Sequence, residues 1–236
     1  VAGTLGLLDA MRESGVEQLV FSSTAAVYGE PEQVPITEDM PLQPTNVYGR
    51  TKLMIEKMMA DYSRAYGLRY VALRYFNAAG ASLLGNIGED HRPETHLIPL
   101  ILQAALGQRE SVSIFGTDYP TPDGTCLRDY IHVKDLASAH VLAMDHLQQG
   151  GGCRTYNLGT ENGFSVREII ETVKKVTGRN FTVKEEARLA GDLEKRIASS
   201  EKIKKELHWE PCHSNIEEIV ATAWRWHEGH PKGYEK

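Results

Sequence analysis

The sequence predicts an α/β fold in which part of a parallel sheet is followed by a smaller mixed α+β lobe. Over residues 4–75, short β-rich runs alternate with helical patterns, an order typical of parallel sheets. After residue 77 the composition changes to Gly-rich and polar stretches between short strands and helices. We therefore interpret the first part as the C-terminal part of a Rossmann-type sheet and the rest as a separate lobe.

The helices and strands of the first part are predicted from the spacing of apolar residues and from the positions of glycine and proline. Residues 4–14 have a helix-like pattern with apolar residues at Leu5, Leu7, Leu8 and Met11, and Gly15 ends the pattern. The loop over 29–44 contains four prolines and cannot be regular. The remaining predicted elements are a buried strand over 18–22, a helix over 45–66 ended by Gly67, and a strand over 69–75.

The second part is predicted from shorter signals. Ser165 with Glu168, and Ser214 with Glu217, have the spacing of helix capping boxes, and Asp135 is expected to cap a helix that runs to residue 147. The other expectations are loops over 78–94, a helix over 97–106, and strands over 111–115, 131–133 and 155–158. The two capped helices are expected to end at Gly178 and to reach Trp226.

Composition excludes several classes of protein. The net charge is −6, and nothing favours nucleic acid, which needs a basic face. The odd cysteine count of 3, without a CxxC pair, disfavours a disulfide scaffold or zinc ribbon and fits reduced thiols in the cytoplasm. No apolar run approaches the roughly 20 residues that span a bilayer, so we expect no membrane partner.

Tyr48 and Lys52 form the first motif with chemical content. They are four residues apart on a predicted helix and share a face. An ammonium near a phenol favours the phenolate and lowers its pKa from about 10 toward neutrality, so Tyr48 can act as a general base. Taken alone, such a pair is common on amphipathic surface helices.

Hydroxyl residues directly after the first predicted strand strengthen this interpretation. Ser22, Ser23 and Thr24 stand where ligand sites lie in open α/β sheets, just past the carboxyl end of a strand. Thr24 is then placed to share a substrate hydroxyl with Tyr48. The order Ser-Ser-Thr followed by Tyr-x-x-x-Lys resembles the extended branch of the short-chain dehydrogenase/reductase superfamily.

Further segments resemble the UDP-galactose/UDP-glucose 4-epimerase family of that branch over nearly the whole chain. They are residues 75–77, 114–116, 118–121, 128–133, 191–192, 224–226 and 231–234. The resemblance implies an NAD-dependent isomerase that oxidises the sugar transiently at C4. Tyr48 is then the base, Lys52 lowers its pKa and holds the nicotinamide ribose, and Thr24 positions the hydroxyl.

The resemblance also implies the binding residues for both ligands. Ser22, Ser23, Tyr75 and Phe76, with Tyr48 and Lys52, are expected to bind NAD. The UDP-hexose is expected to contact Asn77, His96, Leu97, Ser113, Phe115, Arg128, Tyr130, Arg188 and Asp192. His96 stands where many members carry Asn, and Arg188 stands one place before the position of a usual phosphate-binding Arg, now Leu189.

One family motif is missing from the 236 residues: the glycine-rich loop for the NAD pyrophosphate. The chain also begins at Val1, inside a predicted helix, so we expect an N-terminally truncated sequence that is inactive alone. Residues 1–77 are expected to be the remainder of the NAD-binding domain, with 129–160 returning to it. Residues 78–128 and 161–236 are expected to form the sugar-nucleotide lobe, and the full-length protein a homodimer.

Three alternatives share some of these residues. A 4,6-dehydratase places Asp-Glu after the Ser/Thr, where this chain has Ala25 and Ala26. A uronic-acid epimerase or decarboxylase of the same branch, and a non-catalytic UDP-sugar-binding fragment, are the others. No metal is expected, because the pairs His208/His213 and His227/His230 lack a zinc-site pattern.

Overall fold

The computed structural model describes residues 1–189 and 193–235, which fall into two compact units. The first unit consists of residues 1–76, 136–161 and 198–210, and the second of residues 77–135, 162–197 and 211–236. Each unit is therefore assembled from segments that are far apart in the sequence. The α/β fold and its parallel sheet are as predicted.

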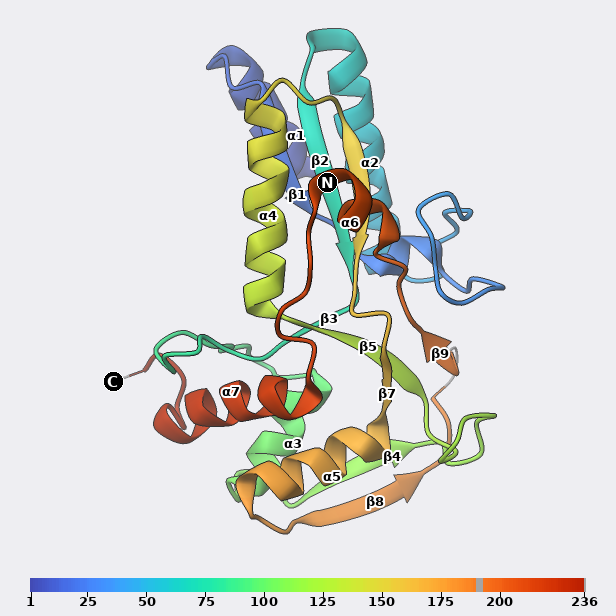
Figure 1. Cartoon of the computed structure of the whole chain (residues 1–236), viewed down its shortest axis with the longest axis vertical. Helices are drawn as coiled ribbons and strands as arrows, with labels where there is room; N and C mark the ends of the chain where they lie inside the picture. The colour runs from blue at the N-terminus through green and yellow to red at the C-terminus, as the bar shows by residue number, and fades with distance from the viewer. Residues whose placement is uncertain (190–192, 236) are drawn as a thin grey trace. The chain divides into compact units, whose positions relative to one another are not determined.

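The first unit is built on a three-stranded parallel sheet in the order β1-β2-β6 (Figure 1). Its strands pair in register, with Gln18 opposite Arg69 and Val71 opposite Arg154. Its elements are α1 (Ala2–Glu13), β1 (Gln18–Ser22), the 3-10 helix η1 (Ala25–Tyr28), α2 (Val47–Tyr66), β2 (Arg69–Tyr75), α4 (Val133–Gln148), β6 (Arg154–Leu158) and α6 (Glu201–Leu207). Strands β1 and β2 have the predicted bounds.

The helices of this unit attach to the sheet by packing and by hydrogen bonds. Leu8 of α1 and Met59 of α2 pack in one core cluster with Ala72 of β2. On α4, the Leu147 carbonyl accepts hydrogen bonds from Gln18 Nε2 (3.3 Å) and Arg69 Nη1 (2.9 Å). These contacts fix α4 at the N-terminal ends of β1 and β2, and the predicted hydroxyl residues lie at the opposite end of β1.

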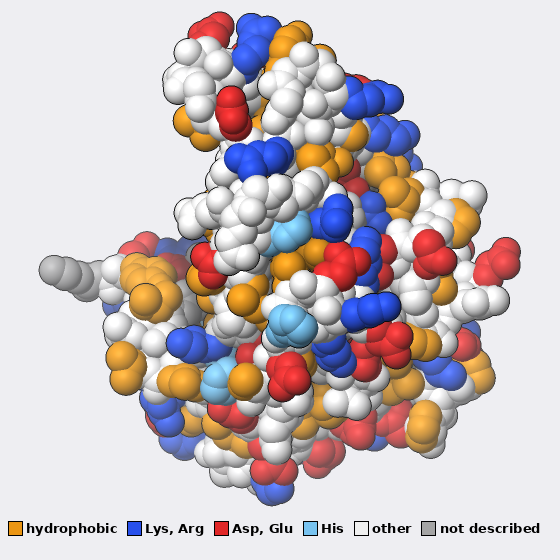
Figure 2. All heavy atoms as spheres, turned by 45° about the horizontal axis from the view of Figure 1, so that its top comes forward, with side chains coloured by type: hydrophobic (Ala, Val, Ile, Leu, Met, Phe, Trp, Pro, Cys, Tyr) orange, Lys and Arg blue, Asp and Glu red, His pale blue; other side chains and the backbone are white. Residues whose placement is uncertain are grey.

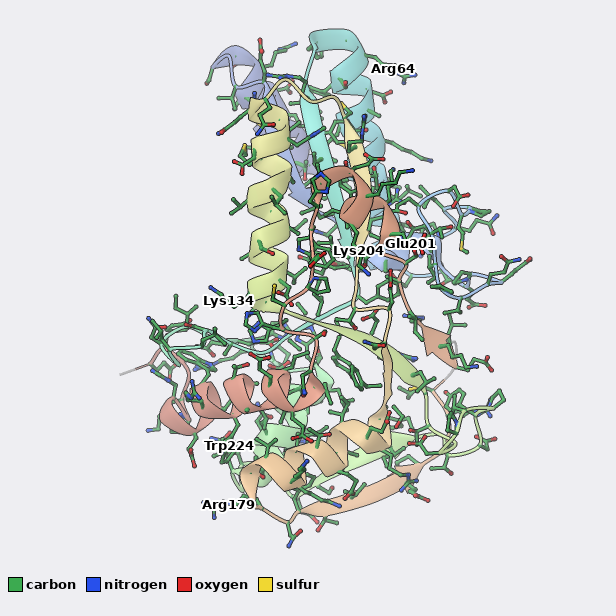
Figure 3. All side chains as sticks on the ribbon, viewed as in Figure 1. Arg64, Lys134, Arg179, Glu201, Lys204 and Trp224 are labelled. Atoms are coloured by element: carbon green, nitrogen blue, oxygen red, sulfur yellow. The ribbon has the colours of Figure 1, made fainter. Side chains whose placement is uncertain are left out.

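Helix α6 was assigned to the second lobe from sequence, and the structure corrects this. Ile203 is fully buried, and Lys202 Nζ donates to the Thr155 carbonyl of β6 at 2.9 Å. Glu201 and Lys204 also project from α6 (Figure 3), and Lys204 Nζ lies 2.9 Å from a Glu161 carboxylate oxygen. A helix of seven residues has too short a hydrophobic pattern to indicate which unit it packs against.

The second unit combines short strands with three helices (Figure 1). Strand β5 pairs with β3, β7 and β9, and β4 pairs with β8. The elements are β3 (Asn77–Ala79), α3 (Leu97–Ala105), β4 (Ser111–Phe115), β5 (Leu127–His132), β7 (Gly163–Ser165), α5 (Val166–Thr177), β8 (Thr182–Glu186), β9 (Lys195–Arg196) and α7 (Ile216–Gly229). Side chains from α3, α5 and α7 form its hydrophobic core with Val112, Ile114 and Tyr130.

Three local predictions in this part need correction. Residues 77–79 form β3 rather than a loop, because they pair with β5. Strand β5 begins at Leu127, four residues before the predicted strand, because its early residues pair with β7 and β9. Residues 129–135 accordingly belong to the second unit and not to the Rossmann part.

The helix caps show where local patterns suffice. The Ser165/Glu168 capping box is present, and Gly178 ends α5 in the left-handed conformation as predicted. Asn215, rather than Ser214, caps α7 by accepting hydrogen bonds from Glu217 N and Glu218 N. Asp135 lies in the first turn of α4, and its carboxylate accepts from Cys212 N (3.0 Å) and His213 N (2.9 Å) instead of capping. Asn and Ser cap about equally well, so neighbouring candidates are not resolved by sequence.

Candidate active site

Helix α2 presents Tyr48 and Lys52 on one face, as predicted. Its N-terminus is capped by Asn46, whose side chain accepts from Gly49 N at 2.7 Å. A Cβ added at Gly49 would lie 2.4 Å from the Ala26 carbonyl oxygen. Only glycine therefore lets the first turn of α2 approach η1 so closely, which brings Tyr48 toward the residues that follow β1.

Thr24 lies between β1 and η1 and is 8% exposed. Its Oγ1 accepts a hydrogen bond from Ala26 N at 3.1 Å, which caps η1. Its side chain also hydrogen-bonds with the Tyr48 phenol. The structure thus brings together the hydroxyl and the phenol that the sequence predicted to act together.

Lys52 reaches the end of β1 from α2. Its Nζ donates to the Ser22 carbonyl at 2.8 Å, lies 4.8 Å from the centre of the Phe21 ring and 5.7 Å from that of Tyr48. Burial lowers the pKa of Lys52. An ammonium has three donors, and one of them is used by the Ser22 carbonyl.

The electrostatics of Tyr48 differ from the prediction. Although the residue is 55% exposed, burial of its phenol is the largest influence and raises its pKa above 10, with a smaller contribution in the same direction from Tyr75. The hydrogen bond with Thr24 acts against this and lowers the pKa. The neighbour that favours the phenolate is Thr24. The Lys52 ammonium lies farther away and donates to the Ser22 carbonyl.

A buried ion pair that the sequence did not indicate supports these residues. Arg74 of β2 holds Glu56 of α2 through two hydrogen bonds, Nε–Oε1 at 3.0 Å and Nη2–Oε2 at 2.5 Å. The two side chains are only 5% and 8% exposed. Ser23 donates its hydroxyl hydrogen to the same carboxylate. Tyr48, Lys52 and Glu56 are spaced by four residues, so one face of α2 carries both the candidate catalytic groups and their anchor.

The network continues to β6 through Tyr28. The Tyr28 hydroxyl accepts from Arg74 Nη1 at 2.8 Å and donates to Asn157 Oδ1 at 2.7 Å. Burial on its own would lower the pKa of Arg74, but hydrogen bonds from Arg74 to Glu56 and Tyr28 outweigh it and raise the pKa. These bonds link α2, β2, η1 and β6, so they fix the geometry around Thr24.

Ser22 and His140 form a second contact that was not predicted. Ser22 Oγ lies 2.8 Å from His140 Nε2, and His140 Nδ1 lies 2.8 Å from the Leu136 carbonyl oxygen. Since a carbonyl oxygen only accepts, Nδ1 carries the proton, and in the neutral ring Nε2 accepts from Ser22. A lone His on α4 gives no sequence signal for this contact.

The other two residues predicted to contact the cofactor, Tyr75 and Phe76, lie at the C-terminal end of β2. Tyr75 lies at the last position of the strand, opposite Leu158, and influences the pKa of Tyr48 electrostatically. Phe76 follows it and packs partly buried against a core cluster that contains Val27 and Leu53. Both residues therefore lie in the same unit as Tyr48.

The predicted nucleotide contacts lie in the second unit. Phe115 is the last residue of β4 and is 40% exposed, and Ser113 lies two residues before it, on the same face of the strand. Arg128 of β5 donates from Nη1 to the carbonyls of Leu127 (2.8 Å) and Leu193 (2.9 Å). An exposed aromatic ring at a strand end and a planar guanidinium in the same unit are groups suited to a base and a phosphate.

Asn77, His96 and Leu97 are placed around β3 and α3. Asn77 Nδ2 donates to the Asp129 carbonyl at 3.0 Å. His96 precedes α3, and its Nδ1 lies 2.5 Å from Glu89 Oε1. Leu97 is the first residue of α3 and packs partly buried against the core of this unit.

Of the remaining predicted contacts, Arg188 and Tyr130 are engaged by other groups of the protein. Arg188 Nε lies 2.6 Å from Asp118 Oδ1, and its guanidinium stacks 4.1 Å from the centre of the Tyr119 ring. Tyr130 is 4% exposed and packs in the hydrophobic core, where burial raises the pKa of its phenol. Asp192 lies outside the described residues.

Charged side chains of both signs lie on the described surface. On the face drawn in Figure 2, basic and acidic side chains of the described residues are interspersed, without a continuous basic area. None of the helices within residues 1–189 and 193–235 combines the length and apolarity needed to cross a bilayer.

Comparison with known proteins identifies relatives over the whole chain. Residues 1–159 match the model of the NAD dependent epimerase/dehydratase family. The UDP-glucose 4-epimerase of Halalkalibacterium halodurans is 57% identical over 234 residues, which cover 99% of this chain and 70% of that protein.

Solved structures give the same result. A crystal structure of a UDP-glucose 4-epimerase superposes with a TM-score of 0.97 at 55% identity, covering 99% of this chain and 71% of that one. The UDP-glucose 4-epimerase from Bifidobacterium longum in complex with NAD+ and UDP has a TM-score of 0.91 at 39% identity, covering 98% and 69%.

Proposed function

The chain belongs to the NAD-dependent epimerase/dehydratase family, and we propose that it supplies the catalytic and sugar-nucleotide-binding residues of an enzyme that interconverts UDP-galactose and UDP-glucose. The proposal concerns these 236 residues joined to a glycine-rich dinucleotide-binding segment, which their sequence does not contain. The 236 residues by themselves are expected to be inactive.

The observation that carries the proposal is the contact between Thr24 and Tyr48, with Lys52 on the same helix face. Thr24 is fixed by its bond to Ala26 N, so its hydroxyl has a defined position from which to orient the sugar C4 hydroxyl. Tyr48 then takes the C4 hydroxyl proton as the C–H bond breaks and returns a proton to the oxygen in the reverse step. A single group that takes and returns one proton suits an isomerisation without net proton release.

The donor set around Lys52 fits the nicotinamide end of NAD. Lys52 has N–H donors beyond the one that it gives to Ser22, and the Tyr48 phenol lies within 5.7 Å of it, measured from the ring centre. Ribose hydroxyls are acceptors and donors of the kind that an ammonium and a phenol bind. NAD held by these residues would supply reversible hydride transfer at C4. Ser22, Ser23, Tyr75 and Phe76 are proposed to complete this contact.

For the UDP moiety, Phe115 with Ser113 is proposed to bind uracil, and Arg128 and Asn77 the diphosphate. His96, Leu97 and Asp192 complete the proposed contacts. Arg188 must leave Asp118 before it can hold a phosphate, since its Nε is engaged at 2.6 Å. Tyr130 is proposed to act by supporting β5 from the core, because it is buried.

The dehydratase alternative lacks its proton-transfer groups. Water elimination needs an additional acid and base beside the hydroxyl residue, and these positions are Ala25 and Ala26. Ala25 is 7% exposed, so water has little access to its position to replace the missing acid or base. Epimerisation needs no such pair.

We also propose that the full-length protein is a cytoplasmic homodimer. Met59 of α2 is buried in the core, but Val47 (68%) and Met54 (51%) of this helix are exposed. An apolar helix face of this kind suits a second copy of the protein. Light scattering of the whole protein with Met54→Glu tests this, since the change should shift the protein toward monomer.

Activity with UDP-galactose tests the main proposal. The whole protein is incubated with UDP-galactose, and the UDP-glucose formed is measured with a coupled UDP-glucose dehydrogenase. We expect enzyme-dependent formation of UDP-glucose that requires bound NAD. If the NAD-loaded protein forms none, the proposed reaction is wrong.

A further inference from the structure

Residues 89–96 gather four side chains with metal-ligand atoms before helix α3. Glu89, His91, Glu94 and His96 each offer one such atom, and these atoms all lie within 4.8 Å of one another. His96 Nδ1 lies 2.5 Å from Glu89 Oε1 and 3.3 Å from Glu94 Oε1. His91 Nδ1 lies 3.4 Å from Glu94 Oε1, and the two imidazole rings are stacked 5.0 Å apart.

The carboxylate at the centre of this group is fixed in place. The Glu94 side chain is only 6% exposed, and its Oε1 accepts hydrogen bonds from Thr95 N (2.7 Å) and His96 N (2.8 Å). The imidazoles of His91 and His96 are 47% and 59% exposed, so solvent reaches the cluster from their side. The cluster therefore combines a buried, oriented carboxylate with accessible nitrogens.

Contacts with the C-terminal segment hold the loop that carries these residues. Trp226 Nε1 donates to the Glu89 carbonyl at 2.9 Å, and Asp90 accepts from Tyr234 N at 3.0 Å. A Cβ at Gly88 would lie 2.1 Å from the Trp226 ring, so the loop passes directly over the indole. Arg92 is directed to Asp90, Glu235 and the Lys232 carbonyl, so its charge is neutralised by other groups.

Both the ligand types in the cluster and the distances between their atoms suit a divalent cation. Two carboxylates beside two imidazoles are ligand types that Zn2+ accepts, at bond lengths of about 2.0–2.2 Å. In a tetrahedral site, ligand atoms at these bond lengths lie about 3.3–3.6 Å from one another. The Nδ1–Oε1 distances of 3.3 and 3.4 Å match those edges, and the 2.5 Å contact of His96 with Glu89 has to lengthen.

We infer that Glu89, His91, Glu94 and His96 bind one divalent transition-metal ion of the Zn2+ class. The ion takes the place of the direct contacts between the imidazole Nδ1 atoms and the carboxylates, and it fixes the loop against the start of α3. With Nδ1 of His96 on the metal, its ring proton is on Nε2, so the imidazole remains a hydrogen-bond donor. The use of that donor for a sugar nucleotide rests on the proposed function, but metal binding itself does not.

The test measures metal binding in the absence of any nucleotide. Untagged whole protein is stripped with a chelator and titrated with ZnCl2 in a calorimeter, and Co2+ is added separately to observe the visible absorption of tetrahedral Co2+. We expect one ion per chain. His91→Ala and His96→Ala should each weaken binding by at least ~10-fold, the lower end of the cost of losing even an outer-shell partner.

His213→Ala is the matched control. His213 Nδ1 also contacts a carboxylate, Glu218 Oε1 at 2.7 Å, but His213 does not belong to the four-residue cluster. This variant should keep wild-type affinity, and melting curves without metal verify that all variants are folded. A thermal shift with Zn2+ should accompany binding in the wild type and in His213→Ala only. Absence of stoichiometric binding, or binding that survives in His91→Ala or His96→Ala, would overturn the inference, whether or not the protein is an epimerase.

Discussion

In the first unit a network of buried hydrogen bonds lies next to the predicted catalytic side chains, whereas in the second unit the predicted contacts Arg188 and His96 are exposed and paired with carboxylates. Thr24 is 8% exposed, and next to it Ser23 binds the Glu56 carboxylate that Arg74 also holds. In contrast, Arg188 is held by Asp118, with side chains 43% and 75% exposed.

This difference fits the two tasks that we propose. A group that transfers a proton has to be held close to its working geometry, because small displacements are costly in rate. A group that binds a nucleotide can exchange one exposed partner for another at little cost, since exposed ion pairs contribute only about 0–1 kcal/mol. Substitutions in the two units should therefore have very different consequences.

The largest effect is expected for Arg74→Met in the first unit. It leaves the buried Glu56 carboxylate without its cation, and removing one partner of a buried pair costs about 3–5 kcal/mol of unfolding free energy. Urea denaturation measures the change. Arg188→Met, which breaks the exposed pair with Asp118, is the control and should cost about 0–1 kcal/mol.

The double variant Glu56→Leu/Arg74→Met sharpens this prediction. With both charges replaced by apolar groups, no uncompensated charge is buried, and the protein should be more stable than Arg74→Met alone. Equal losses for Arg74→Met and Arg188→Met would show that the two units do not differ in this way.

The next effect is on catalysis. Tyr48→Phe removes the proposed base and should reduce epimerisation at least ~100-fold, about 2.7 kcal/mol in the barrier. UDP affinity, measured by calorimetry, should hardly change. Tyr66→Phe, the same substitution at an exposed position of α2, should leave turnover intact. Substantial turnover in Tyr48→Phe would mean that another group is the base.

A smaller effect is expected for Thr24→Val. The Thr24 hydrogen bond lowers the pKa of Tyr48, while burial raises it. Removing the bond should raise the pKa, so less phenolate is present at any given pH and the alkaline rise of kcat/KM should move to higher pH. One net hydrogen bond is worth about 1 kcal/mol, so the loss at pH 7 should be no more than about 10-fold. Thr24→Ser keeps the hydroxyl, and a profile shifted as far as that of Thr24→Val would contradict this role.

Elements defined by neighbours in sequence could be predicted. The strands over 18–22, 69–75 and 111–115 have the expected bounds, and the first and last of these β-rich runs end at Ser22 and before Gly116. The Tyr48/Lys52 pair follows from helix periodicity alone. The capping box of α5 follows equally from Ser165 and Glu168.

Partners that are distant in sequence could not be predicted. Arg74 meets Glu56 only because β2 and α2 pack together, and Ser22 meets His140 across 118 positions of sequence. The spacing of Glu56 from Lys52 did carry a signal, since it is a charged residue on the inward face of an otherwise amphipathic helix. The Ser22 carbonyl was likewise not predicted as the acceptor of Lys52, because the direction of a long side chain depends on partners that are distant in sequence.

Transfer of the C4 hydrogen tests the central claim most directly. The whole protein is given UDP-galactose deuterated at C4 of the sugar, and the UDP-glucose formed is examined by mass spectrometry and NMR. If the hydride leaves C4 and returns to the opposite face within one active site, deuterium should be retained at C4 of the product. Tyr48→Phe should form at least ~100-fold less of this product in the same time. Replacement of deuterium by hydrogen from solvent would contradict transient oxidation at C4, and with it the roles given to Thr24, Tyr48 and Lys52.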